Sequence, residues 1–190
     1  MTSRPQRVDA QANRGRILDV AEDVFGRGGE SASTEEVARE AGVGIATVFR
    51  HFPTKAALLQ AVLIRRLDRL RAQAESLLDT VPDPGAAFFD FFRHLVADAP
   101  TKIAIGDALL DAGGDEGGEA TQASLGLRRA VGALLDRAQR SGAVRDDVEL
   151  PEVYALLVAT SRAAAVASLD DEVKARTLAI IFDGLAPRPH

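Results

Sequence analysis

Apolar residues recur every three or four positions along nearly the whole chain. Ile17, Leu18, Ala21 and Val24 show this spacing, and residues 55–78 repeat it over a much longer stretch. An α-helix turns once in 3.6 residues, so the spacing gathers these side chains on one face. No stretch shows the alternation of apolar and polar residues that a half-buried β-strand requires. The sequence therefore predicts an all-α protein.

Glycines, prolines and capping residues divide this pattern into about nine predicted helices. They cover residues 14–26, 34–41, 45–51, 55–78, 86–97, 101–112, 121–141, 152–168 and 171–185. Pro100 is expected to end a helix, because proline has no amide hydrogen and clashes with the preceding turn. We expect two domains, an amino-terminal one over residues 10–70 and a second one over residues 71–190.

The composition excludes several classes of protein. The chain has no cysteine, which excludes a disulfide framework, a thiol nucleophile and a cysteine metal site. No apolar stretch reaches the roughly 18 residues of a membrane span, and Arg162 interrupts the longest candidate. No glycine-rich phosphate loop and no plausible acid–base constellation is present. We therefore expect a cytoplasmic, nucleoid-associated protein that is not an enzyme, needs no cofactor and has no membrane partner.

The net charge of −5 is unevenly distributed along the chain. Residues 1–55 hold eight basic and eight acidic residues, so the whole acidic excess lies in residues 56–190. Between Glu40 and Lys55 every charge is positive or can become so, at Arg50, His51 and Lys55. A local basic patch of this kind can contact phosphates although the chain is acidic overall.

Two short predicted helices on either side of Gly42 have the pattern of a helix-turn-helix. Val37 and Ala41 are expected to bury the first helix, and Val43 and Val48 to hold the second against it. The outer face of the second helix carries small, apolar or cationic residues: Gly44, Ile45, Ala46, Thr47, Phe49 and Arg50. A recognition helix needs such a face to enter the roughly 12 Å wide major groove of DNA.

This stretch resembles the DNA-binding domain of the tetracycline-repressor (TetR) family of bacterial transcription regulators. The residues that carry the resemblance are Ser33, Val37, Ala38, Ala41, Gly42, Val43, Val48, Phe49, His51, Phe52, Lys55 and Leu58. The resemblance covers about residues 10–60. Three residues depart from the family pattern, since Gly44, Ala46 and Phe49 stand where serine, glycine and tyrosine are usual.

The resemblance implies a ligand-responsive regulator, usually a repressor, that binds a palindromic double-stranded DNA operator as a homodimer. It implies that Thr34, Thr47, His51 and Lys55 contact the phosphate backbone, and that Ile45, Ala46 and Arg50 face the bases or their borders. The arginines at positions 4, 7, 14 and 16 are either a disordered tail or an arm that reaches the DNA. The alternative function is an all-α ligand-binding or adaptor dimer without productive DNA binding, which the three departures would permit.

The resemblance also implies that the last two helices, about residues 152–185, form the dimer interface. Alanines at 155, 159, 163, 164 and 167 would allow close approach of the two copies. The apolar face of the last helix would be Leu178, Ile181, Phe182 and Leu185.

The second domain is expected to bind a small, largely apolar effector. The candidate lining residues are Phe88, Phe92, Leu109, Leu127, Val131 and Leu157, with Tyr154 and Arg162 as polar anchors. Arg162 interrupts an apolar run, so we expect it to be buried against an acidic partner or an anionic ligand group. The loop 113–118 is the candidate lid.

Asp90, His94 and Asp98 share one predicted helix face. A solvated face explains them better than a metal site, so no metal is predicted.

Overall fold

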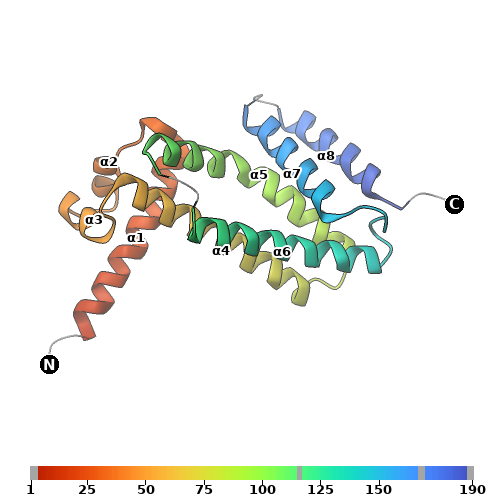
Figure 1. Cartoon of the computed structure of the whole chain (residues 1–190), viewed down its shortest axis with the longest axis horizontal. Coiled ribbons are helices and arrows are strands. Elements are labelled where there is room, and N and C mark those ends of the chain that lie inside the picture. The colour runs from red at the N-terminus through yellow and green to blue at the C-terminus, as the bar shows by residue number, and fades with distance from the viewer. Residues whose placement is uncertain (1–3, 115–116, 167–169, 188–190) are drawn as a thin grey trace. The chain divides into compact units, whose positions relative to one another are not determined.

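The computed structural model describes residues 4–114, 117–166 and 170–187, and it confirms the all-α prediction within them (Figure 1). The described residues form eight α-helices and one short 3-10 helix, Gly29–Ser31. The α-helices are α1 (Arg4–Gly28), α2 (Thr34–Glu40), α3 (Ile45–His51), α4 (Lys55–Thr80), α5 (Pro84–Asp111), α6 (Glu119–Arg140), α7 (Leu150–Val166) and α8 (Asp171–Leu185). No helix in the described ranges combines the length and the hydropathy that crossing a membrane requires.

Helix α5 differs from the prediction, because Pro100 lies inside it and does not end it. The predicted helices 86–97 and 101–112 are one helix, so eight helices replace the expected nine among the described residues. A proline inside a helix costs about 3 kcal/mol. Buried residues on both sides of it, among them Leu95, Ile105 and Leu109, offset that cost because each buried aliphatic side chain stabilises by about 1.5–3 kcal/mol.

Helix α1 is longer than predicted, since it begins at Arg4 and not near Arg14. The helical backbone therefore includes the segment that the sequence left open as either a tail or an arm. Side-chain caps begin three other helices. The side chains of Ser33, Thr54 and Asp170 accept hydrogen bonds from backbone amides three residues ahead, at 3.1, 3.0 and 2.8 Å.

The chain divides into two compact units, and each unit is made of two separate segments of the sequence. Residues 1–66 and 101–121 form the first, here called the head unit, and residues 67–100 and 122–190 form the second, the body unit. Helices α4 and α5 each contribute residues to both units. Within the head unit α5 approaches α1 closely at Gly26, where an added Cβ atom would lie 2.7 Å from Cγ2 of Thr101.

The head unit is held together by an apolar core and by a buried ion pair. Ile17, Phe25 and Leu58 are among its fully buried side chains. Arg66 of α4 donates a hydrogen bond to Glu22 of α1, and both side chains are buried. A buried charge is costly unless an opposite charge faces it, so this pair ties α1 to α4 in one register.

The body unit has a phenylalanine-rich core built mainly on α5. Phe88 and Phe92 of α5 are buried, as are Leu134 and Leu135 of α6. Phe182 of α8 packs against this cluster, with its ring centroid 4.7 Å from that of Phe89 and 5.5 Å from that of Phe92. These aromatic contacts anchor the carboxyl-terminal part of α8.

Replacing Glu22 with glutamine tests the buried ion pair. The change keeps the size of the side chain but removes the charge that opposes Arg66, so we expect the free energy of unfolding to fall by about 3 kcal/mol. Urea denaturation followed by circular dichroism at one fixed protein concentration measures it. Asp90→Asn is the control, because it removes an exposed ion pair with Arg93 and should cost less than about 1 kcal/mol. Equal losses for the two variants would contradict the role of the buried pair.

Candidate functional site

The helix-turn-helix is formed by α2 and α3 with a tight turn between them. Gly42 has a φ of +66°, a left-handed conformation that glycine adopts without strain. The amide of Val43 donates to the carbonyl oxygen of Ala38 at 3.0 Å, which closes the turn. Gly44 is the N-cap of α3 and forms no side-chain capping bond there. The turn therefore has the geometry that the sequence predicted, including the loss of the usual side-chain cap.

The outer face of α3 is exposed and carries no acidic residue. Ile45 is 36% exposed and Phe49 is 42% exposed, which are high values for large apolar side chains. Ala46 and Arg50 are also exposed, whereas Val48 on the opposite face is fully buried. An exposed apolar patch of this kind marks an interaction surface. The structure thus brings together most of the residues that the sequence assigned to DNA.

Three other predicted contact residues lie in different environments. Lys55 is half-buried, and its Nζ atom donates to the carbonyl oxygen of Glu30 at 3.2 Å and lies 5.5 Å from the Phe25 ring centroid. Thr47 is half-buried, and Thr34 is buried at the start of α2. The hydroxyl of Thr34 is thus less available to a phosphate than the resemblance implies.

Two of the three acidic side chains of α2, Glu36 and Glu40, form ion pairs with neighbouring arginines. Glu40 accepts hydrogen bonds from Arg27 at 3.0 and 3.1 Å, and it lies 3.8 Å from Arg39. The hydrogen bond and the charge of Glu40 raise the pKa of the Arg27 side chain. Arg50, in contrast, forms no ion pair with any described residue. The positive charge of α3 is therefore available to an anionic partner, while the charge of Glu40 is already paired.

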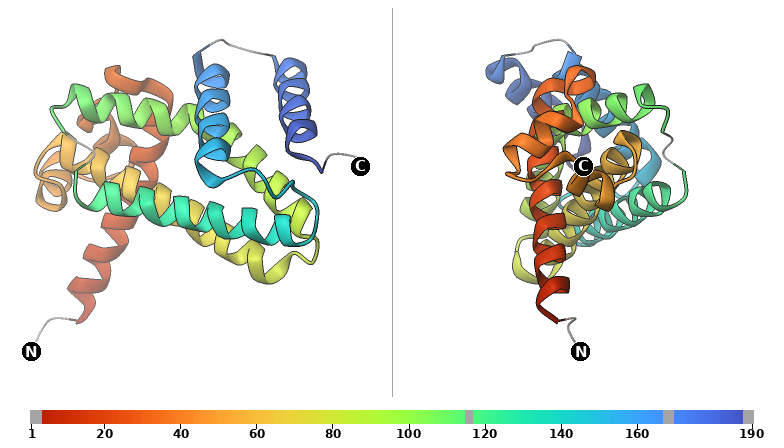
Figure 2. Two further views of the ribbon diagram at one scale, coloured as in Figure 1. Left: turned by 45° about the vertical axis from the view of Figure 1, so that its right-hand side comes forward. Right: turned by 90° about the vertical axis from the view of Figure 1, so that its left-hand side faces the viewer.

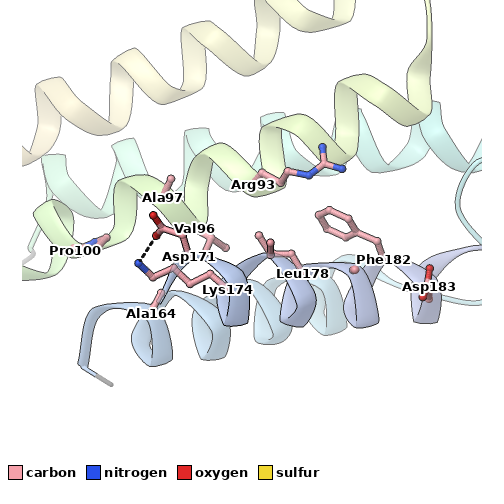
Figure 3. A pocket seen from close by; sticks show the side chains of 12 residues that line it. Arg93, Val96, Ala97, Pro100, Ala164, Asp171, Lys174, Leu178, Phe182 and Asp183 are labelled. Atoms are coloured by element: carbon pink, nitrogen blue, oxygen red, sulfur yellow. Dashed lines mark hydrogen bonds and ion pairs between the residues drawn. The ribbon is translucent and has the colours of Figure 1, made fainter. Parts of the chain in front are cut away.

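The body unit contains a groove of about 730 Å³ between α5, α7 and α8 (Figure 3). Its apolar surface includes Val96, Leu178 and Phe182, which Figure 3 shows along the facing sides of α5 and α8. Two cations lie along it. The guanidinium of Arg93 lies 4.9 Å from the Phe182 ring centroid, and Nζ of Lys174 lies 3.1 Å from a carboxylate oxygen of Asp171. Its volume is within the roughly 300–1,000 Å³ of small-molecule sites.

The groove is lined by none of the eight residues predicted to bind the effector. Five of these residues are buried in the core of the body unit: Phe88, Phe92, Leu127, Val131 and Leu157. Leu109 is buried but belongs to the head unit. Tyr154 lies under the guanidinium of Arg128, 5.0 Å from it.

Arg162 is exposed. The prediction that it is buried against an acidic side chain or an anionic ligand group is therefore wrong. An exposed guanidinium is solvated and needs no buried partner. Two residues of the predicted lid, at positions 115 and 116, lie outside the described residues. Among the described residues no group of three or more side chains could hold a metal ion, and this includes the row of Asp90, His94 and Asp98.

Helices α7 and α8 each expose large apolar side chains to solvent. Ile180 is 72% exposed, and Leu156 and Val158 are 38% and 44% exposed. Exposed alanines at 155, 159 and 163 follow one another at i, i+4, i+8 on α7. Phe182 and Leu185, which the sequence assigned to a dimer interface, point into the body unit. Ala167, also assigned there, lies outside the described residues.

Models of known protein families match both the amino-terminal and the carboxyl-terminal part of the chain. Residues 17–62 match the family described as bacterial regulatory proteins, tetR family. Residues 83–187, more than half of the chain, match the family described as transcriptional regulator SbtR-like, C-terminal domain.

Among curated proteins, the HTH-type transcriptional activator FasR of Mycolicibacterium smegmatis is 35% identical over 99 residues. These cover 48% of this chain and 45% of that protein. The HTH-type transcriptional regulator SAR0097 of Staphylococcus aureus is 36% identical over 78 residues, which cover 40% of each protein. The chain thus spans less than half the length of these curated relatives.

Among the solved structures that match nearly the whole chain, two are more than 30% identical to it. The crystal structure of the TetR transcription regulatory protein from Mycobacterium vanbaalenii is 39% identical, with a TM-score of 0.79. The match covers 96% of this chain and 100% of that one. The TetR transcriptional regulator SCO0520 from Streptomyces coelicolor is 32% identical, with a TM-score of 0.76 and coverage of 93% and 99%. The chain therefore belongs to the TetR family of bacterial helix-turn-helix transcriptional regulators.

Proposed function

We propose that this chain is a dimeric, ligand-responsive repressor that binds a palindromic DNA operator in the bacterial cytoplasm. The observation that carries the proposal is the outer face of α3, which is exposed, free of acidic residues and flanked by paired carboxylates. The three departures from the family pattern all lie exposed on this surface. Gly44 is exposed at the N-cap, Ala46 leaves room for a base edge, and Phe49 offers an apolar contact.

We assign separate roles to the residues around α3. Ile45, Ala46 and Arg50 face the base edges in the major groove, because they lie exposed on the outer face of the helix. We propose that Thr47, His51 and Lys55 contact phosphates; such contacts position the protein but carry no sequence information. Two copies of α3 in a dimer would reach half-sites about 34–36 Å apart.

We propose that α7 and α8 form the dimer interface through their exposed apolar side chains. The alanines of α7 let a second helix approach closely, and Ile180, Leu156 and Val158 supply apolar area that a monomer would leave in water. Burial of apolar area stabilises by roughly 25 cal/mol per Å².

We propose that the effector occupies the groove between α5, α7 and α8. The groove has the volume and the apolar surface of a small-molecule site, with charged side chains along its edge. The effector can shift the DNA-binding equilibrium only by the difference between its affinities for the DNA-binding and the released conformations.

Ala46→Asp tests the DNA-binding surface. A carboxylate on the exposed face of α3 would face the negatively charged duplex, and like charges at an interface cost several kcal/mol. We expect the affinity for a selected operator duplex to fall on the order of 100-fold, with the helix content unchanged. Fluorescence anisotropy measures the affinity. Ala72→Asp, an exposed position on α4, adds the same charge and should leave the affinity within about twofold.

Ile180→Asp tests the dimer interface. The substitution places a charge in an apolar contact, which is costly because the carboxylate loses its hydration without a partner. We expect monomers in sedimentation velocity at micromolar concentration, with a folded body unit because Ile180 is not a core residue. Leu110→Asp is the control, since Leu110 is 62% exposed and lies on α5 in the head unit. A dimer that survives Ile180→Asp would place the interface elsewhere.

Ala97→Trp tests the effector groove. The indole would fill part of the space between α5 and α8, so we expect weaker binding of the apolar fluorescent dye anilinonaphthalene sulfonate in titrations. DNA affinity without effector should stay the same. Ala72→Trp controls for the added aromatic surface. Equal dye binding by both variants and the unmodified protein would exclude this groove as the site.

A further inference from the structure

A basic hollow adjoins the recognition helix but lies outside the helix-turn-helix. It measures about 530 Å³ and is lined by Gln11, Arg14, Gly15, Leu18, His51 and Arg65, from α1, α3 and α4 of the head unit. Three of these side chains are cationic or can become so, and none is acidic. The hollow is therefore complementary in charge to an anion.

Contacts with the head unit position the two arginines of the hollow. The guanidinium of Arg14 lies 5.1 Å from the Phe52 ring centroid, in a cation–π arrangement. Arg65 donates to the carbonyl oxygen of Gly15 at 3.2 Å and forms an ion pair with Asp19. Arg14 is exposed, and it forms no ion pair with the described residues. One guanidinium is thus neutralised, while the other is held in place with its donors available.

The hollow continues the surface that α3 presents to DNA. His51 is the last residue of α3 and also lines the hollow, so the two surfaces share a residue. Gln11, Arg14 and Leu18 of α1 follow at i, i+3, i+7 and share one face of that helix. In both views of Figure 2 the amino-terminal half of α1 extends beyond α2 and α3. A partner on α3 that extends further along the head unit would meet Arg14.

We propose that this hollow receives a backbone phosphate of the DNA duplex, with Arg14 as its principal donor. Helix α1 is then a second DNA-contacting helix of the head unit. The inference rests on the DNA binding proposed above. A phosphate fits better than a base, because the planar guanidinium fork matches phosphate oxygens and the contact lies beside the recognition helix, where the backbone runs. A free anion in such an open hollow would lack the further contacts that a duplex makes along α3.

The test is the salt dependence of DNA binding by Arg14→Gln. Each phosphate contact contributes about 0.9 to the slope of log K against log salt. A dimer that loses two contacts should therefore show a slope shallower by about 1.8, and an affinity lower by 10- to 100-fold in about 0.1 M salt. The probes are a selected operator duplex and a mixed-sequence duplex of the same length. Phosphate contacts are independent of sequence, so both duplexes should show the change.

Two matched variants show whether the change in slope depends on the charge of residue 14 or on any loss of positive charge from α1. Arg16→Gln removes the same charge from an exposed residue of α1 that does not line the hollow and bonds only to Asn13 among the described contacts. It should leave the slope close to that of the unmodified protein. Arg14→Lys keeps the charge and should keep most of the slope. Circular dichroism and thermal melting show whether each variant is folded.

The outcomes distinguish the two proposals. If the unmodified protein binds neither duplex, the proposed function fails. If it binds both and Arg14→Gln changes the slope no more than Arg16→Gln does, the phosphate site is overturned. If inorganic phosphate at millimolar concentration raises the melting temperature through Arg14 but the DNA slope is unchanged, the hollow is a free-anion site and the assignment to DNA is wrong.

Discussion

The packing of α1 on α4 is the constraint on which the geometry of the head unit depends. Helix α4 begins at Lys55, four residues after the last residue of the recognition helix, so its direction limits where α3 can lie. The ion pair between Arg66 and Glu22 is buried, and a change of register would leave both charges without their opposite partner in a region of low polarity. Arg65, which precedes Arg66 on α4, forms a more exposed ion pair with Asp19 of α1. Apolar contacts alone tolerate small shifts, whereas a buried ion pair specifies one position.

Helix α3 has one face that packs against the head unit and an opposite face that is exposed. Val48 is fully buried and Phe52 nearly so, which fixes the helix on its neighbours. Ile45 and Phe49 stay exposed, and a monomer gains nothing from leaving such side chains in water. The arginines that pair with Glu40 reduce the repulsion of a polyanion by the neighbouring helix. This division of α3 into a buried and an available face is what DNA recognition requires of a short helix.

Helix α8 shows a second division of roles, between its two ends and between its two faces. Phe182 and Leu185 hold its carboxyl-terminal part against the body unit. Nearer its start, Lys174 and Leu178 are only half-buried and line the groove. Ile180 points away from the body unit. A helix that is anchored at one end, borders a groove and exposes Ile180 on its outer side can serve both a ligand and a second copy of the chain.

The sequence by itself determined the all-α class, the helix-turn-helix and the family. The caps at Ser33, Thr54 and Asp170 and the turn at Gly42 were predictable because each depends on residues within four positions along the chain. Only the tertiary structure decided the rest. Pro100 stays inside α5 because burial on both sides of it outweighs its local cost, and Arg162 reaches solvent although its neighbours are apolar. The same holds for the pairing of Arg66 with Glu22, 44 positions apart, and for the side of α8 that turns inward at Phe182. Which face of a helix is covered depends on elements far away in the chain, and periodicity alone contains no information about them.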